Sequence, residues 1–161
     1  MKFAIPGELE QLAWFGRGSQ ENYWDRKSGA AVGIYHSTVD EWITRYVHPQ
    51  ENANRTDVRW IDFADAGGNG LRVKAAGRPL GVSAWPYSAA DLATAKHDTE
   101  LPRRDFITVN VDGWQMGVGG DNSWGLPVHS KYRVPRAAKY AYAFDLIPLT
   151  GGKPKRASEK S

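Results

Sequence analysis

The chain has 161 residues, no cysteine and a formal net charge of +3, a length that suits one domain with a substantial core. The lack of cysteine excludes a disulfide framework and a thiolate metal site. The charge does not indicate nucleic-acid binding, because residues 151–161 hold four basic side chains against one acidic side chain and account for all of it. Apolar runs are too short to cross a bilayer, so no membrane partner is expected either.

Composition favours a β-rich fold. Seven Trp and seven Tyr accompany 17 Gly and nine Pro, a mixture that suits strands joined by tight turns. Flat indole rings can also cover the apolar C–H faces of a sugar, although most of the seven are expected in the core.

Strand patterns dominate the chain. In chain order, strands are expected at residues 9–15, 58–64, 70–76, 81–85, 106–111, 114–118 and 140–146. The clearest is 70–76, where Leu71, Val73 and Ala75 alternate with Arg72 and Lys74, as in a half-buried strand.

Turn signals join several of these strands. A glycine-rich link at 65–69 and the pair Asp112-Gly113 both predict hairpins, the second between 106–111 and 114–118. In the last strand, Tyr140, Tyr142 and neighbouring apolar residues are expected on one face, and Pro148 is expected to end it.

Helix signals are few. Ser88 to Asp91 forms a capping-box variant that predicts a short helix to about Lys96, and a weaker helical turn is expected at 37–42. The sequence therefore predicts an antiparallel β-sandwich with one short helix over residues 1–150, followed by a disordered basic tail at 151–161.

No nucleotide-binding or zinc motif is present, and the four histidines are too scattered in sequence to predict a metal cluster. Glycoside hydrolysis would need a pair of carboxylates about 5–10 Å apart. The candidates are Glu21, Asp25, Glu51 and Asp121. Arg26 lies near the first two and Arg55 near the third, so lowered pKa values and a role in pinning loops are expected for them instead.

Three polar, turn-rich segments are candidate ligand-contacting loops: 16–26, 49–55 and 119–125. In the last, Trp124 follows small and polar residues. Its indole is expected either to project from the loop or to fold back as a lid on the core.

These segments carry a resemblance to the C-terminal (small-chain, domain 5) region of bacterial β-galactosidases of glycoside hydrolase family 2. GRGSQENYWDR at 16–26 resembles G-x-GP-x-ENYPDR, PQENANR at 49–55 resembles P-[QS]-ENG-x-R, and VDGWQMGVGGDNSWG at 111–125 resembles hydrophobic-DG-x-x-MG-[VI]-GGD-[DN]-SW. The likeness runs from about Phe3 to Leu149.

The resemblance implies an all-β supersandwich similar to the galactose mutarotase fold, of which this chain is the latter half. It also implies that Trp124 stacks against bound sugar, supported by Asp121, Asn122 and Ser123. A second set is expected to structure loops or to contact sugar: Glu21, Asn22, Tyr23, Asp25, Arg26, Glu51, Asn52 and Arg55.

The sequence departs from the family pattern at three positions. Ser19 and Trp24 replace proline, which is expected to alter loop stiffness. Ala53 replaces glycine and is expected to avoid the positive φ that glycine could take. Asn122 lies within the family's range.

The function that the resemblance implies is that of an accessory domain of a retaining β-galactosidase acting on terminal β-D-galactosides such as lactose. The catalytic glutamates lie in a TIM barrel absent from this chain, so the piece alone is expected to be inactive. The alternatives are a stand-alone carbohydrate-binding module, with Trp124 and Tyr23 or Trp24 as its platform, and an aldose epimerase-like protein.

No cofactor is expected in this piece, although the family often uses Mg and Na in its catalytic domain. The expected partners are a galactoside, reached through the parent enzyme, and the parent's TIM barrel. Strand edges left unpaired near the amino terminus predict self-association into a homo-oligomer. The bacterial cytoplasm and the periplasm both remain open as locations.

Overall fold

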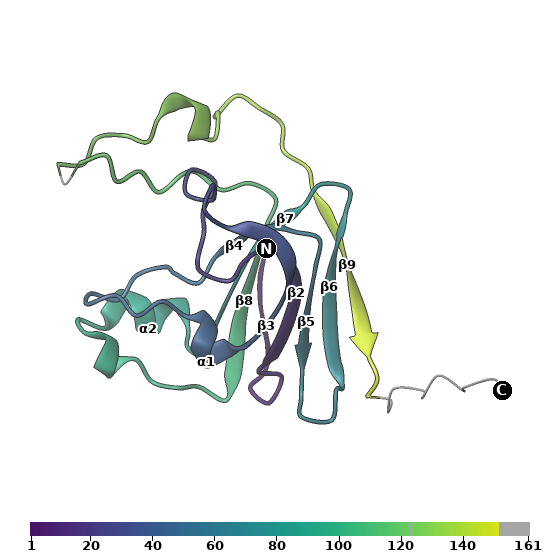
Figure 1. The fold of residues 1–161 in the computed structure, drawn as a ribbon. Coiled ribbons are helices and arrows are strands. Elements are labelled where there is room, and N and C mark those ends of the chain that lie inside the picture. Colours follow the sequence, from purple (N-terminus) through teal and green to yellow (C-terminus); the bar gives the residue numbers. More distant parts are fainter. Residues whose placement is uncertain (123, 152–161) are drawn as a thin grey trace.

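The computed structural model describes residues 1–122 and 124–151 as two antiparallel β-sheets packed face to face (Figure 1). One sheet has the order β1-β8-β7-β4, formed by Lys2–Pro6, Phe106–Asp112, Leu80–Trp85 and Arg55–Val58. The other has the order β3-β2-β5-β6-β9, formed by Ala31–Thr38, Gln11–Gly18, Trp60–Ala64, Gly70–Ala76 and Ala143–Leu149. The predicted all-β sandwich is thus confirmed, and 152–161, most of the predicted tail, lie outside the described residues.

The core lies between the sheets: side chains alternate inward along β2 and β5, whereas β7 and β8 are buried along almost their whole length. Its largest fully buried side chains are Trp14, Trp42, Trp85, Phe63, Ile61, Leu80 and Ile107. Trp14 stacks on Trp42 with ring centroids 4.9 Å apart. Only three of the seven tryptophans, Trp14, Trp42 and Trp85, are buried, so the expectation that most of them lie in the core is wrong.

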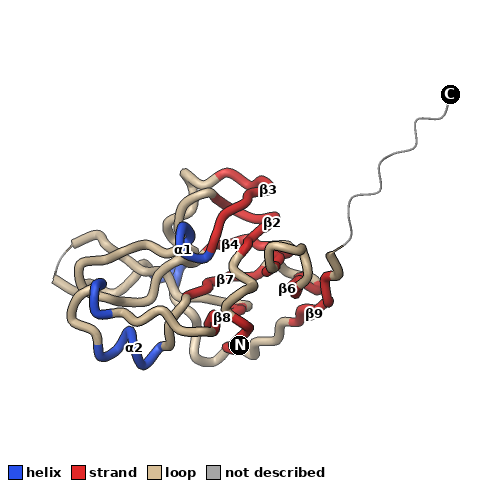
Figure 2. The backbone as a smooth tube through the Cα atoms, turned by 90° about the horizontal axis from the view of Figure 1, so that it is seen from below, coloured by secondary structure: helices blue, strands red, loops and turns tan. Residues whose placement is uncertain are grey.

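Two short helices lie to one side of the strands (Figure 2). Helix α1 (Val39–Trp42) begins at the N-cap Thr38, and α2 (Ala89–Thr94) begins at the N-cap Ser88. In each, the cap hydroxyl accepts from the third helical N–H while that residue's carboxylate accepts from the cap N–H, a reciprocal capping box. Both predicted helical turns are present, so the described fold has two short α-helices rather than one.

Three strand predictions differ from the structure. Residues 114–118 form no strand, because both edges of β8 are already occupied by β1 and β7 and the Asp112-Gly113 turn leads out of the sheet. Strand β9 continues past Pro148, which lies opposite Leu71; β9 is the outermost strand, where proline is tolerated. The predicted strand 58–64 is split, because Val58 ends β4 and residues 60–64 form β5 of the other sheet. Tyr140 and Tyr142 precede β9, and the predictions also omitted β1 and β3.

Residues 113–142 connect β8 to β9 and project from the sandwich as an extension, which we call the arm (Figure 1). Its outgoing limb runs from Gly113 toward Trp124, and its returning limb passes through a short 3-10 turn, Ser130–Tyr132. Several apolar side chains of the arm face solvent: Met116, Val118, Trp124 and Leu126.

Candidate functional site

Trp124 lies in the outer part of the arm with 91% of its surface exposed, so it does not fold back as a lid on the core. Its backbone N–H donates to Asn122 Oδ1 at 2.9 Å. Asp121 pairs with His129 of the returning limb. The third expected support, Ser123, lies outside the described residues.

The arm is attached to the body by the segment that carries the ENYWDR motif. Asp25 accepts hydrogen bonds from the N–H groups of Val118 and Gly119, at 3.0 Å and 2.8 Å. Trp24 packs edge-on against Tyr132 of the returning limb, with ring centroids 6.4 Å apart. Adjacent residues of one motif therefore hold both limbs of the arm.

Glycines give this attachment its shape. A Cβ on Gly117 would collide with the carboxylate of Asp25, so only glycine allows the outgoing limb to come this close. Gly119 and Gly120 then take φ values of +73° and +104°, where the chain turns toward Trp124. The glycines of the third motif thus have separate tasks: one admits the carboxylate and two bend the chain.

Glu21 joins the first motif to the second. Its side chain is 6% exposed; Oε1 accepts from Arg26 at 2.7 Å and from the Tyr46 hydroxyl at 2.6 Å. Oε2 accepts from the backbone N–H of Ala53 at 2.7 Å. A carboxylate enclosed by three donors is suited to holding two loops together, and its lone pairs are already engaged.

Asn22 continues this connection in the interior. Its Oδ1 accepts from both the N–H and the hydroxyl of Thr56, at 2.9 Å and 2.6 Å. Its backbone is paired with Asn54, whose side chain donates to the Asn22 carbonyl at 2.8 Å. The buried amide therefore fixes the first motif to the start of β4.

Asn52 and Arg55 extend the network under the core tryptophans. Asn52 donates to the Tyr87 hydroxyl at 3.1 Å and accepts from the N–H of Thr44 at 3.2 Å. Arg55 is 3% exposed; its guanidinium lies 4.9 Å from the Trp42 ring centroid and donates to the Ser19 carbonyl. Desolvation lowers the pKa of Arg55 to about 9, so it stays cationic at neutral pH.

Two expectations for the charged residues were wrong. Arg55 points into the core and does not neutralise Glu51, whose pKa is raised by partial desolvation and then by the charge of Asp112. Arg26 pairs with Glu21, whereas Asp25 is occupied by the arm. Proximity along the chain thus identified the Arg26–Glu21 pair correctly and misassigned Asp25 and Glu51, because neighbouring side chains in a tight loop point in different directions.

Ala53 is a further correction, because it takes φ of +68° while fully buried. The geometry that a glycine would adopt freely is kept despite the methyl group, and the bond from Ala53 N–H to Glu21 holds it there.

Tyr23 is 5% exposed and lies beneath the Arg26 guanidinium, 5.3 Å from the ring centroid. Burial, followed by the charge of Glu21, raises the pKa of its hydroxyl. Tyr23 therefore cannot form an open platform with Trp124. Trp24 is 42% exposed but faces Tyr132.

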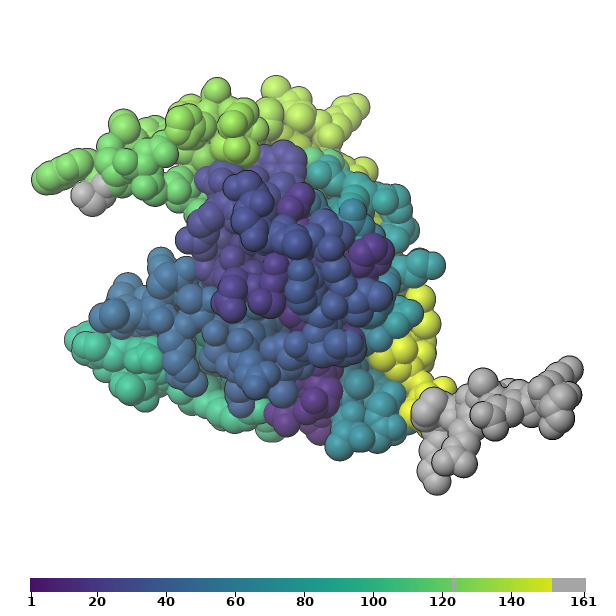
Figure 3. All heavy atoms as spheres, viewed as in Figure 1, coloured from purple at the N-terminus to yellow at the C-terminus, as the bar shows by residue number. Residues whose placement is uncertain are grey.

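The arm stands clear of the body, with a hollow beneath its outer part (Figure 3). Within the described ranges, no group of three His, Asp or Glu side chains is placed to hold a metal ion. No helix in that part of the chain is long and apolar enough to cross a membrane.

Sequence reasoning missed Trp24 and His129 as contacts that shape the arm. The signal for Trp24 was its replacement of a proline, which removes a stiff residue and supplies a ring to pack on. His129 gave no signal, because its contact with Asp121 depends on how the limbs pair.

Together, the fold and the arm define a β-sandwich that presents an exposed aromatic ring and whose motif carboxylates are largely engaged in holding loops. A family model described as beta galactosidase small chain matches residues 1–146, and the chain belongs to that family. It is 41% identical to β-galactosidases of Halalkalibacterium halodurans and Priestia megaterium, over 91% and 92% of this chain. It is 39% identical to β-galactosidase BgaC of Bifidobacterium adolescentis, over 84% of this chain. The chain spans about 14% of the length of the first two relatives and 13% of the third.

Proposed function

We propose that this chain is the C-terminal accessory part of a β-galactosidase and that the arm contributes Trp124 to the sugar site of the parent enzyme. The parent would hydrolyse terminal β-D-galactosides, with its catalytic glutamates in a TIM barrel outside this chain. The observation that carries the proposal is the 91% exposed indole in the outer part of an arm that Asp25 attaches to the body.

Stacking is the chemistry that suits such a ring. An indole offers a large rigid apolar surface and loses little conformational entropy when a sugar covers it. Covering about 100 Å² of apolar surface contributes about 2.5 kcal/mol at ~25 cal/mol per Å². The loss of entropy on association reduces this, so one ring supports a site rather than makes one.

The decisive experiment uses the whole parent enzyme with a Trp124→Ala substitution. We expect kcat/KM for a nitrophenyl β-galactoside to fall by about 10- to 100-fold, consistent with the loss of ~1.4–2.8 kcal/mol of transition-state stabilisation. Trp124→Phe should recover part of the loss. Ile34→Ala, at an apolar residue of β3 that is 62% exposed, is the matched control and should leave the kinetics unchanged.

Unchanged kinetics in Trp124→Ala would remove the ring from the site. The isolated chain should show no turnover of the same substrate, and turnover at the parent's rate would contradict an accessory role. Saturable shifts of Trp124 signals on adding galactose to the isolated chain would favour a stand-alone binding module instead.

A further inference from the structure

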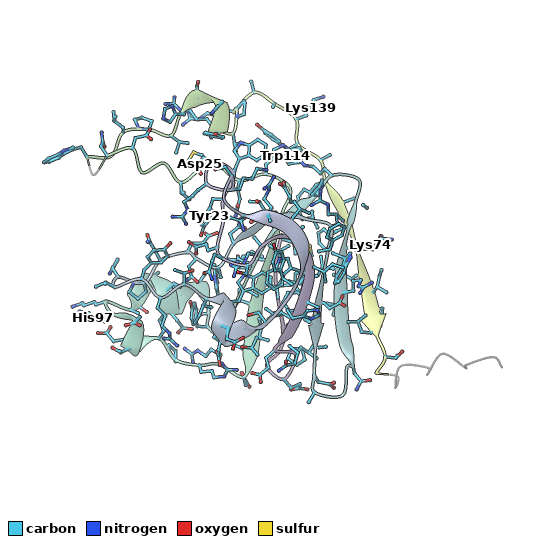
Figure 4. All side chains as sticks on the ribbon, viewed as in Figure 1. Tyr23, Asp25, Lys74, His97, Trp114 and Lys139 are labelled. Carbon is cyan, nitrogen blue, oxygen red and sulfur yellow. The ribbon has the colours of Figure 1, made fainter. Side chains whose placement is uncertain are left out.

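A cavity of about 280 Å³ lies at the root of the arm, between its returning limb and the ends of β7 and β8. Three aromatic side chains line it: Trp24, Trp114 and Tyr140. Trp114 and Tyr140 meet edge to face, with ring centroids 5.0 Å apart. In Figure 4, Trp114 lies under the returning limb, with Lys139 farther along that limb. The volume is close to the lower end of the ~300–1,000 Å³ range of small-molecule sites.

The cavity wall is cationic. Arg78, Lys131 and Arg133 line it, and none of the three forms an ion pair with a carboxylate in the part of the chain that the structure describes. The Arg78 guanidinium lies 3.9 Å from the Trp114 ring centroid, and Arg133 Nε donates to the Val128 carbonyl at 2.6 Å. Both groups are held in place and still have N–H donors to offer.

The two carboxylates in the wall are offset by other charges. Asp57 accepts from Arg17 at 2.6 Å and from Lys27 at 3.0 Å. Asp112 accepts from Gln115 Nε2 at 3.3 Å and carries one charge against the three unpaired cations of the wall. The field inside the cavity is therefore set by the unpaired cations.

The sequence of the returning limb strengthens this field. Between Asp121 and Asp145 the chain carries four basic residues and no acidic residue, in the order Lys131, Arg133, Arg136 and Lys139. Residues 1–150 as a whole carry equal numbers of basic and acidic side chains, so the rest of the body is acidic by comparison and this basic run beside the cavity is distinctive.

We propose that this cavity binds a monosaccharide that carries one acidic group, either a carboxylate or a phosphate. The aromatic walls suit the apolar faces of a sugar ring, and the cations suit the acidic group. Gln115 also lines the cavity, and its Nε2 is held by a donated hydrogen bond to Asp112 at 3.3 Å.

Binding would tie the two limbs of the arm together at their base. Trp114 and Gln115 belong to the outgoing limb, whereas Lys131, Arg133 and Tyr140 belong to the returning limb. A ligand that contacts both limbs would restrict their separation and so reduce the motion of the arm. This effect does not depend on what the Trp124 ring contacts.

The test uses the ¹⁵N-labelled 161-residue chain and follows its tryptophan indole N–H signals by NMR. The probes are galacturonate, galactose 6-phosphate, neutral galactose and inorganic phosphate. We expect saturable shifts of Trp24 and Trp114 with one or both acidic sugars, at least tenfold tighter than with galactose or phosphate alone. Buried Trp14, Trp42 and Trp85 are internal controls whose signals should not move.

Two variants locate the anion. Arg78→Gln and Lys131→Gln should each weaken acidic-sugar binding on the order of tenfold, because each removes a charged donor. Arg45→Gln, at a side chain that is 64% exposed and does not line the cavity, should leave it unchanged. Higher salt should also weaken binding.

The proposal is overturned if both acidic sugars bind no more tightly than galactose, or if the shifts appear at Trp124 and not at Trp24 and Trp114. It is also overturned if Arg78→Gln and Lys131→Gln both bind the acidic sugars as tightly as the unaltered 161-residue chain does. A failure here leaves the Trp124→Ala kinetics of the parent untouched, so the two proposals are tested separately.

Discussion

Removing the carboxylate of Asp25 should release the arm without unfolding the sandwich. Asp25 accepts from Val118 N–H at 3.0 Å and from Gly119 N–H at 2.8 Å. A hydrogen bond to a charged group contributes about 1.5–3 kcal/mol, and we take about 1 kcal/mol for each bond here because solvent reaches this part of the arm. Asp25→Ala should therefore lower the free energy of local opening by about 2 kcal/mol, which makes opening about 30-fold more frequent.

Native-state amide hydrogen exchange measures this opening directly. In Asp25→Ala, exchange at Val118 and Gly119 should accelerate about 30-fold, whereas exchange at Val109 in the centre of β8 should hardly change. Asp25→Asn keeps one acceptor oxygen, so its exchange rates at Val118 and Gly119 should fall between those of the unaltered chain and those of Asp25→Ala. Asp145→Ala, at an exposed carboxylate of β9, is the matched control.

Unchanged exchange at Val118 and Gly119 would refute this reasoning. So would equal acceleration at Val109, because the carboxylate would then support the whole sandwich and not the arm. Acceleration of the arm in Asp145→Ala would show that any lost negative charge has the same effect.

Three further predictions concern the body of the domain. Ala53→Gly should change the free energy of unfolding in urea by less than about 1 kcal/mol, because relief of ~1–2 kcal/mol of left-handed backbone strain is offset by the loss of a buried methyl and by a more flexible unfolded chain. Ala53→Val should lower the free energy of unfolding by at least about 2 kcal/mol. Equal stability of the two variants would contradict the strain at this position. Burial alone would raise the pKa of Asp57, but hydrogen bonds from Arg17 and Lys27 outweigh it and hold that pKa below its ordinary value. Asp57 therefore adds to the free energy of unfolding above about pH 4, and this contribution is lost as the pH falls through its folded pKa. Asp57→Asn should make the free energy of unfolding fall less steeply at acid pH. An unchanged slope would count against the pairing of Asp57 with Arg17 and Lys27. Strand β1 forms an edge of its sheet, so light scattering should show a mass that rises with concentration, and a constant monomer mass would argue against edge pairing.

Clear local patterning, and not the closeness of a partner, decided which strands the sequence located. Strands β7 and β8 were placed within one residue although β7 pairs with β4 and β8 with β1, far along the chain, whereas β3 was missed beside its partner β2. The alternation at Gly70–Ala76 gave the bounds of β6, which pairs with β5 across a short turn. The Asp112-Gly113 signal failed because turn chemistry is local, whereas the edges of β8 were claimed by β1 and β7 from elsewhere in the chain. Strand pairing at long range competes with a local hairpin, and sequence alone does not show which one wins.

The candidate site was also only partly predictable from the sequence. The motif spacing located the loop that holds Trp124, and a run of small and polar residues indicated an exposed ring. The partners of the carboxylates were not predictable, because Glu21 reaches Ala53 and Asp25 reaches Gly119 across distances set by the fold. Ala53 itself takes a positive φ that its residue type did not predict, because its N–H is held by Glu21.

The arm connects a strand of one sheet to a strand of the other, and this connection affects how such a protein can evolve. The arm leaves β8 of one sheet and enters β9 of the other, so only its ends are constrained by strand pairing. A change in the exposed outer arm need not repack the core, whereas Gly117 itself must stay small to admit Asp25. The outer arm can therefore change without destabilising the sandwich, while the root of the arm is held by Asp25.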